Sequence, residues 1–282
     1  MPALPPPATG GGHSPRTQEP VPGRRRRTLV LALCALPVVA LLAVAALVPL
    51  PFSIAQPGMT ADVLGSNKGV PVITIEGAES RRTSGQLRMT TIAATGPDAE
   101  VGLGDLLGAW FATDRAVLPR ESVYPVGDTT KEIERHNTQE FEKSQDAASQ
   151  AALRYLRRSP ESVRVGLRLA DVGGPSAGLM FSLGVVDKLD GNGGGGDLTG
   201  GRRIAGTGTI TPDGKVGAVG GVPLKTQAAK RDGASVFLVP KAECGDARAE
   251  LPKGLRLIPV TTLTGAVDAL KSLDSGGKVP SC

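Results

Sequence analysis

The chain has 282 residues, a net charge of +5, only 3% aromatic residues and only two histidines, His13 and His136. So few aromatics argue against a surface that stacks on nucleic acid, and we expect no nucleic-acid partner. The sequence has neither an HExxH motif nor a Cys/His cluster with metal-ligand spacing, so we expect no metal site.

The N-terminal segment, residues 1–27, is rich in proline, glycine and arginine, and we expect a disordered basic tail. Residues 28–50 carry no charge and are long enough to cross a bilayer core of about 30 Å as a helix. The alternative is a cleaved signal peptide with a processing site at 43–45, although the apolar stretch exceeds the usual length of a signal-peptide core. The arginines at 24–27 predict a cytoplasmic N-terminus, with everything after residue 50 on the outer side of the cell membrane.

Two of the three cysteines, Cys244 and Cys282, lie in the part of the chain that we expect to be exported. An oxidising compartment would allow them to form a disulfide that ties the C-terminal tail, residues 275–282, to the body of the domain. Two unpaired thiols are the alternative.

Residues 57–274 show the mixed pattern of an α/β (α+β) domain. Residues 70–77 and 86–94 are typical of two strands joined by a polar turn, and residues 103–112 of a short apolar helix. Residues 129–158 become amphipathic, with apolar side chains at helical spacing. Residues 162–171 alternate like a half-buried strand.

The C-terminal half continues with a glycine-rich segment, residues 191–201, that we expect to be a flexible loop. A strand over 202–210 and a turn at 211–216 follow. The sequence then predicts a helix from about residue 224, a strand over 234–240 and a threonine-capped helix over 261–273.

Ser176 stands in GGPSAG, residues 173–178, at the start of an apolar helical run. One interpretation is that the serine only satisfies a free N–H group at the helix start. The other is that it is a nucleophile, because a helix N-terminus supplies N–H donors and a positive dipole end that can stabilise an oxyanion. Gly173 and Gly174 would let a substrate approach the backbone closely.

A nucleophilic serine needs a base, and the scarcity of histidine directs attention to Lys225. Apolar neighbours would desolvate its amine and lower its pKa toward neutrality, although an ordinary surface lysine is the alternative. Lys225-Thr226 does not complete a phosphate-binding loop, because Leu224 stands where GxxxxGK(S/T) requires glycine. We therefore expect no bound nucleotide and no other cofactor.

Three blocks in this order resemble the proteolytic domain of Lon proteases. They are GGPSAG, AGTGTITPDGKVGAVGG at residues 205–221, and the GG-x3-K-x2-AA pattern around Lys225. The strands and helix expected upstream fit the same domain, so the resemblance covers nearly the whole exported region. It is closest to the membrane-anchored Lon-like proteins of Gram-positive bacteria, which lack the ATPase module.

The resemblance implies a Ser-Lys dyad in which Ser176 is the nucleophile and Lys225 the general base. Thr207 matches a threonine that helps to hold the lysine, and backbone N–H groups from Gly174 to Ala177 would form the oxyanion hole. The implied protein is a membrane-anchored, ATP-independent serine endopeptidase that hydrolyses unfolded or flexible polypeptides through an acyl-enzyme. Lon domains tend to form rings, which leaves a homo-oligomer open.

The chain departs from the pattern of these relatives in two ways. ATP-dependent Lon enzymes often have aspartate where Gly173 stands, but the anchored group also shows glycine there. The anchored relatives usually carry a PDZ domain before the nucleophile strand, whereas Leu156 here runs almost directly into Ser162. Specificity must then come from elsewhere.

Residues 96–140, which include Trp110, Phe111 and Tyr124, form the insertion that we expect either to capture substrate or only to cover the core. The loss of the PDZ domain also leaves a rival function open, that of a catalytically idle, membrane-tethered binding or assembly module. An ATP-linked transport or signalling component is a second rival, against which the missing phosphate loop counts.

Overall fold

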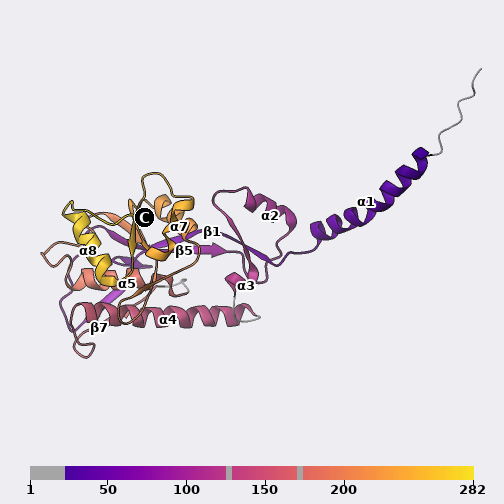
Figure 1. Cartoon of the computed structure of the whole chain (residues 1–282). Helices are drawn as coiled ribbons and strands as arrows, with labels where there is room; N and C mark the ends of the chain where they lie inside the picture. Colours follow the sequence, from indigo (N-terminus) through magenta and orange to yellow (C-terminus); the bar gives the residue numbers. More distant parts are fainter. Residues whose placement is uncertain (1–22, 125–128, 170–173) are drawn as a thin grey trace, which may run out of the picture. The chain divides into compact units, whose positions relative to one another are not determined.

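The computed structural model describes residues 23–124, 129–169 and 174–282 (Figure 1). The chain divides into two units, of which the first ends at Val48 and the second runs from Pro49 to Cys282. Of the disordered tail predicted over residues 1–27, residues 1–22, with His13, lie outside the described residues, and so does Gly173. The prediction is wrong for residues 23–27, which form the first turns of helix α1.

The first unit contains helix α1 (Gly23–Leu47), which includes Pro37. Within the described residues, Arg26–Val44 is the one segment long and apolar enough to cross a membrane, with a mean hydropathy of 2.4. A signal sequence would pass the same test of length and composition. The helix ends three residues before the predicted limit, because Val48 precedes a proline and that position disfavours helical backbone.

The second unit is built on a six-stranded mixed sheet in the order β12-β11-β8-β5-β1-β6. Strands β5, β8, β11 and β12 are parallel to one another, whereas β1 is antiparallel to both of its neighbours. The bounds are β1 (Phe52–Asp62), β5 (Gln86–Ala94), β6 (Ala116–Pro119), β8 (Arg203–Gly206), β11 (Val236–Pro240) and β12 (Arg256–Val260).

Strand β1 corrects the sequence analysis in two respects. The predicted hairpin between residues 70–77 and 86–94 is wrong, because β5 pairs with β1 and β8. Strand β4 (Ile73–Glu76) pairs instead with β7 (Arg164–Leu167). The folded unit also begins before residue 57, since β1 starts at Phe52. Pro57 and Gly58 interrupt the strand pattern, and a shift in register between Pro57 and Thr60 accommodates them.

The remaining strands form two small ribbons and one edge of the main sheet. Small ribbons join β2 (Ser66–Asn67) to β3 (Val70–Pro71), and β9 (Thr209–Ile210) to β10 (Val216–Gly217). The strand predicted over 202–210 is therefore two strands, β8 and β9, which belong to different sheets. Strand β6 lies inside the segment 96–140 and adds an edge to the main sheet.

Apolar side chains cover both faces of the main sheet. On β11, Val236 and Leu238 belong to one core cluster, whereas Phe237 and Val239 belong to a second. This alternation follows from the two-residue period of a strand. The larger cluster packs against helices α4, α5 and α8, and the smaller one against α6 and α7.

The helices of this unit are α2 (Leu103–Trp110), α3 (Arg120–Val123), α4 (Thr130–Tyr155), α5 (Gly178–Leu189), α6 (Val222–Arg231), α7 (Cys244–Ala249) and α8 (Leu263–Asp274). Two short 3-10 helices, η1 (Pro175–Ala177) and η2 (Lys241–Glu243), precede α5 and α7. Thr129 and Thr262 cap α4 and α8 with their side chains.

Helices α4 and α5 pack closely because the second half of α4 buries small side chains. Ala148, Ala151 and Ala152 are all at most 2% exposed. Phe141 and Phe181 meet edge to face, with ring centroids 5.8 Å apart. This contact fixes the start of α5 against the middle of α4.

The glycine-rich segment 191–201 is irregular, as predicted, but it is tied to the body of the unit. The Arg81 guanidinium donates hydrogen bonds to the carbonyls of Gly195 and Gly196 at 2.7 and 2.9 Å. The Asp187 carboxylate accepts one from the Leu198 N–H at 2.8 Å. These hydrogen bonds hold the segment to the rest of the unit at Gly195, Gly196 and Leu198, and the predicted flexibility stays a prediction.

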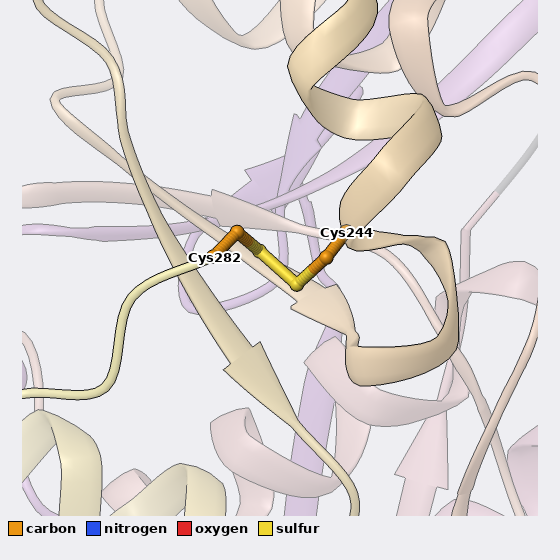
Figure 2. Close-up of a disulfide and its surroundings, with 2 residues drawn as sticks. All are labelled: Cys244 and Cys282. Carbon is orange, nitrogen blue, oxygen red and sulfur yellow. A yellow bond between two sulfur atoms is a disulfide. The ribbon is translucent and has the colours of Figure 1, made fainter.

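Figure 2 shows the disulfide between Cys244, at the start of α7, and Cys282. Their Cα atoms lie 5.4 Å apart and the two residues are separated by 38 positions. Both cysteines pack against the smaller core cluster. The bond thus ties the C-terminal segment to the face of the sheet that carries α6.

Candidate active site

Ser176 lies in the 3-10 turn η1, immediately before α5, and its backbone is held from two sides. The Ser144 hydroxyl of α4 donates a hydrogen bond to the Pro175 carbonyl at 3.0 Å. The Gly208 N–H donates one to the Ser176 carbonyl at 2.9 Å. These bonds fix the turn between helix α4 and the segment that follows β8.

The Ser176 hydroxyl forms no hydrogen bond with any described residue. Gly174 is the N-cap of η1, Ala177 is the N-cap of α5, and neither helix start has a side-chain cap. The half-buried serine is therefore not used to cap a helix in this structure. Its hydroxyl is left available for another partner.

The backbone N–H groups around the serine are not equivalent. The Gly174 N–H, one of the predicted oxyanion donors, already donates to the Asn137 carbonyl of α4 at 3.1 Å. Pro175 has no N–H. The candidate donors at this turn are therefore the N–H groups of Ser176 and Ala177. Gly174 itself adopts a φ of +83°, a value that glycine reaches without strain.

Lys225 lies in the first turns of α6, and its side chain is only 3% exposed. Gly221 starts this helix with a φ of +69°, and a Cβ there would lie 2.8 Å from the Ile92 side chain, so the position requires glycine. Burial lowers the pKa of Lys225 to about 8, because a charged amine is disfavoured where water is excluded. A nearby carboxylate, that of Glu243, opposes this effect in part.

Thr207 connects the lysine to the serine turn. The fully buried threonine follows β8, and its hydroxyl accepts a hydrogen bond from the Lys225 amine at 3.2 Å. The same hydroxyl donates to the Ser176 carbonyl at 3.2 Å. Ser176, Thr207 and Lys225, predicted as one group, therefore lie in one hydrogen-bonded chain.

Within the described residues, no hydrogen bond joins the Ser176 hydroxyl to the Lys225 amine. Catalytic hydrogen bonds are often long or poorly aligned before substrate binds. The lysine amine is hydrogen-bonded to Thr207, and the serine hydroxyl has no hydrogen-bond partner among the described residues. Proton transfer between the two groups would therefore need their side chains to rotate toward each other.

Glu243 is a residue that the sequence analysis missed. One carboxylate oxygen accepts a hydrogen bond from the Val219 N–H at 2.8 Å, and the other is buried with no hydrogen-bond partner among the described residues. Burial raises the pKa of this carboxyl, and its charge raises that of Lys225. No spacing motif indicated Glu243, because it lies in η2, beyond the strand that follows the lysine helix.

Comparisons with known proteins find a family model that matches the part of the chain with these residues. Residues 169–270 match the model of the Lon protease (S16) C-terminal proteolytic domain, and this range includes Ser176, Thr207 and Lys225. The chain is 32% identical to the Lon protease of Roseiflexus castenholzii over 123 residues, which are 39% of this chain and 14% of that protein.

Two further relatives bear the same name. The Lon protease of Chloroflexus aggregans is 38% identical over 94 residues, which are 32% of this chain and 10% of the relative. That of Clostridium acetobutylicum is 28% identical over 194 residues, which are 63% of this chain and 23% of the relative. The chain thus spans less than a quarter of the length of each of these relatives. These matches support a Lon protease proteolytic domain in this chain, with residues 169–270 as the part that the family model covers.

Proposed function

We propose that the chain is a membrane-anchored serine endopeptidase of the Lon type that hydrolyses unfolded or flexible polypeptides without ATP. The observation that carries the proposal is the buried chain of hydrogen bonds from Lys225 through Thr207 to the backbone of Ser176. This chain brings the unpaired Ser176 hydroxyl, at a helix start, together with the desolvated Lys225 amine. A nucleophile and a base are the two groups that acyl transfer to a serine needs.

In the acylation step, the Ser176 oxygen attacks the carbonyl carbon of a peptide bond, and the neutral Lys225 amine accepts the hydroxyl proton. Negative charge then develops on the carbonyl oxygen, where the N–H groups of Ser176 and Ala177 would stabilise it. The C–N bond breaks as Lys225 returns the proton to the leaving amine. An ester between the substrate and Ser176 remains.

In the deacylation step, a water molecule attacks the ester carbonyl while Lys225 accepts a proton from the water. The ester C–O bond breaks, and the proton returns to the Ser176 oxygen. Only a neutral amine can start either step, so a pKa of about 8 leaves a useful fraction of Lys225 neutral near physiological pH.

For location, we propose a cell-membrane protein with a cytoplasmic N-terminus and an extracytoplasmic domain. Support comes from the length and composition of α1, from the arginines that precede it, and from the Cys244–Cys282 disulfide. The N-terminal segment and the domain are then on opposite sides of the bilayer. A signal peptide remains the alternative for α1.

Independence from ATP is proposed because residues 1–282 contain no GxxxxGK(S/T) phosphate-binding loop. Without a bound motor to unfold substrates, the domain would act on chains that are already unfolded or flexible. The catalytically idle binding module remains the second candidate, because the serine and the lysine are not hydrogen-bonded to each other in this structure.

The proposal is tested by incubating the full chain, in lipid vesicles and without nucleotide, with casein. We expect cleavage by the parent protein and none by Ser176→Ala or Lys225→Ala. Matched controls are Ser272→Ala on α8 and Lys230→Ala, an exposed lysine on the same helix as Lys225; both should cleave normally.

A serine-reactive phosphonate probe separates the two candidate functions. Labelling of the parent that is lost in Ser176→Ala supports the peptidase, whereas an unlabelled, inactive parent supports the binding module. Casein cleavage by pure Ser176→Ala protein would contradict the proposed Ser-Lys dyad. Any fragment without α1 should begin near residue 49, because a start at 57 removes the first half of β1.

A further inference from the structure

Helix α2 presents an apolar face that no described part of the chain covers. Leu107, Trp110 and Phe111 are 51%, 75% and 82% exposed. They occupy positions i, i+3 and i+4, which lie on one side of a helix. Exposed apolar patches with a polar rim mark contacts with another protein or with a membrane.

The helix that carries this face is itself well fixed. The Asp105 carboxylate accepts a hydrogen bond from the Gly102 N–H at 3.0 Å, which secures the helix start. On the opposite side Ala109 is only 1% exposed. A Cβ added to Gly104 or Gly108, on the exposed side, would meet nothing within 4 Å. The apolar face is therefore open and is not the frayed end of a loose segment.

The covalent chain limits how far α2 can lie from the end of α1. Leu50 forms an antiparallel bridge with Val101, with a hydrogen bond of 2.9 Å from the Leu50 N–H. Val101 lies two residues before α2, and Leu50 lies three residues after the end of α1. Three residues span about 10 Å at full extension. A chain segment of three residues is thus all that joins α1 to the bridge that precedes α2.

We propose that Leu107, Trp110 and Phe111 dock into the lipid surface beside the anchor, so that α2 is a second, interfacial membrane contact. The inference rests on the proposed anchoring by α1. Tryptophan is enriched at membrane interfaces, and apolar faces of surface helices are buried at the boundary between headgroups and acyl chains.

Charge around this face favours an apolar mode of lipid contact. The exposed side chains that flank it include Asp105, Asp114 and Arg115, so there is no excess of positive charge to seek anionic headgroups. Binding should therefore occur on neutral phosphatidylcholine and should resist salt. Tyr124, from the same segment, donates its hydroxyl to the Thr95 carbonyl at 2.7 Å and takes no part in the face.

Trp110 is the only tryptophan of the chain, so its fluorescence reports on this face alone. The test uses the full chain in phosphatidylcholine vesicles, with and without brominated acyl chains. We expect the brominated lipid to quench most of the Trp110 emission, and Leu107→Ser/Phe111→Ser to lose that quenching. Flotation of the same vesicles reports anchoring by α1, which the double variant should keep.

A positional control moves the tryptophan to another exposed site, in Trp110→Phe/Leu251→Trp; Leu251 is 36% exposed. Equal quenching at both positions would overturn the proposal, because the lipid would then contact the domain non-specifically and not through the α2 face. So would a floating parent protein whose Trp110 is not quenched. A parent that does not float overturns the anchor and, with it, this inference.

Casein added to the full chain in ordinary vesicles distinguishes a different occupant. If Trp110 is insensitive to brominated lipid but shifts its emission when casein binds, the face captures substrate and the proposal is wrong. If Trp110 is quenched by lipid and casein leaves its emission unchanged, the lipid surface is the occupant.

Discussion

A buried ionisable group lies near each end of helix α5, Lys225 of α6 at its start and Asp187 in its last turn, and only the first belongs to the proposed catalytic site. Before its first turn lies Ser176, which Thr207 links to the buried Lys225. In its last turn lies Asp187, which is fully buried. Burial moves both pKa values toward neutrality, that of Lys225 down to about 8 and that of Asp187 up to about 6.

The difference lies in what the two groups face. One Asp187 oxygen accepts the Leu198 N–H and the other has no hydrogen-bond partner among the described residues. The charges that act on it are those of Asp197, Arg81 and Lys188, which belong to the anchors of the glycine-rich segment and to α5. The Lys225 amine instead donates a hydrogen bond to the Thr207 hydroxyl, which donates to the Ser176 carbonyl just before the N-terminus of α5. A shifted pKa does not by itself mark a functional site, because structural networks of charges also shift pKa values. Lys225 differs from Asp187 in the serine and the backbone N–H groups that lie on its side of α5.

The largest expected effect separates the two ends directly. Lys225→Met removes the proposed base and keeps an unbranched apolar side chain in a buried position, so we expect casein cleavage to fall by roughly 10²–10⁴-fold. Asp187→Asn should leave the rate nearly unchanged. Initial rates of both variants, with circular dichroism to check folding, measure this. Similar losses in both would mean that the two ends are not functionally distinct.

Thr207→Val should have a smaller effect on the same end of α5. It removes the hydroxyl between Lys225 and the Ser176 carbonyl but keeps the branched shape, and we expect roughly a 10–100-fold loss in kcat with little change in KM. Thr207→Ser should restore most of the rate, because it returns the hydroxyl. A rescue by serine that fails would assign the threonine a packing role only.

The pH dependence of cleavage sharpens the comparison further. Because the base must be neutral, the rate should rise with pH and reach half its maximum near pH 8, the pKa of the buried lysine. Glu243→Gln removes a negative charge that raises this pKa, so its profile should move to lower pH. A pH–rate profile of each protein measures the shift, and movement to higher pH would contradict the role given to Glu243.

The smallest effect concerns stability at the other end of α5. The pKa of Asp187 is higher in the folded chain than in the unfolded one, so the folded state holds the proton more tightly. The free energy of unfolding should therefore fall as pH rises from about 4 to about 6. Asp187→Asn should lack this decrease and be more stable at pH 7 by up to about 3 kcal/mol. Urea unfolding at several pH values tests it; a parent that gains stability over that range would contradict it.

Elements with a strong local pattern could be predicted from the sequence. The alanines of α4 and the apolar run of α5 have a helical period, and the alternation around β7 indicates a strand. Strand β1 could not be found in this way, since Pro57 and Gly58 lie in its middle. The pairing of β5 with β1 and β8 was also beyond reach, because strand partners depend on the whole topology.

The same distinction holds for the candidate site. Ser176, Thr207 and Lys225 were identified from three sequence blocks, and the structure brings them into one hydrogen-bonded chain. Glu243 and the Asn137 carbonyl come from segments that share no block with them. Glu243 raises the pKa of Lys225, and the Asn137 carbonyl accepts the Gly174 N–H. Both effects depend on tertiary packing, which sequence spacing does not reveal.

The disulfide has a practical consequence for how this protein is produced. Closing 38 positions of chain lowers the entropy of the unfolded state, which corresponds to about 4 kcal/mol in favour of folding. Domains have a total stability of about 5–15 kcal/mol. Material made in a reducing bacterial cytosol would forgo much of that margin. Expression in an oxidising host, or oxidative refolding before purification, is therefore the preparation from which activity should be judged.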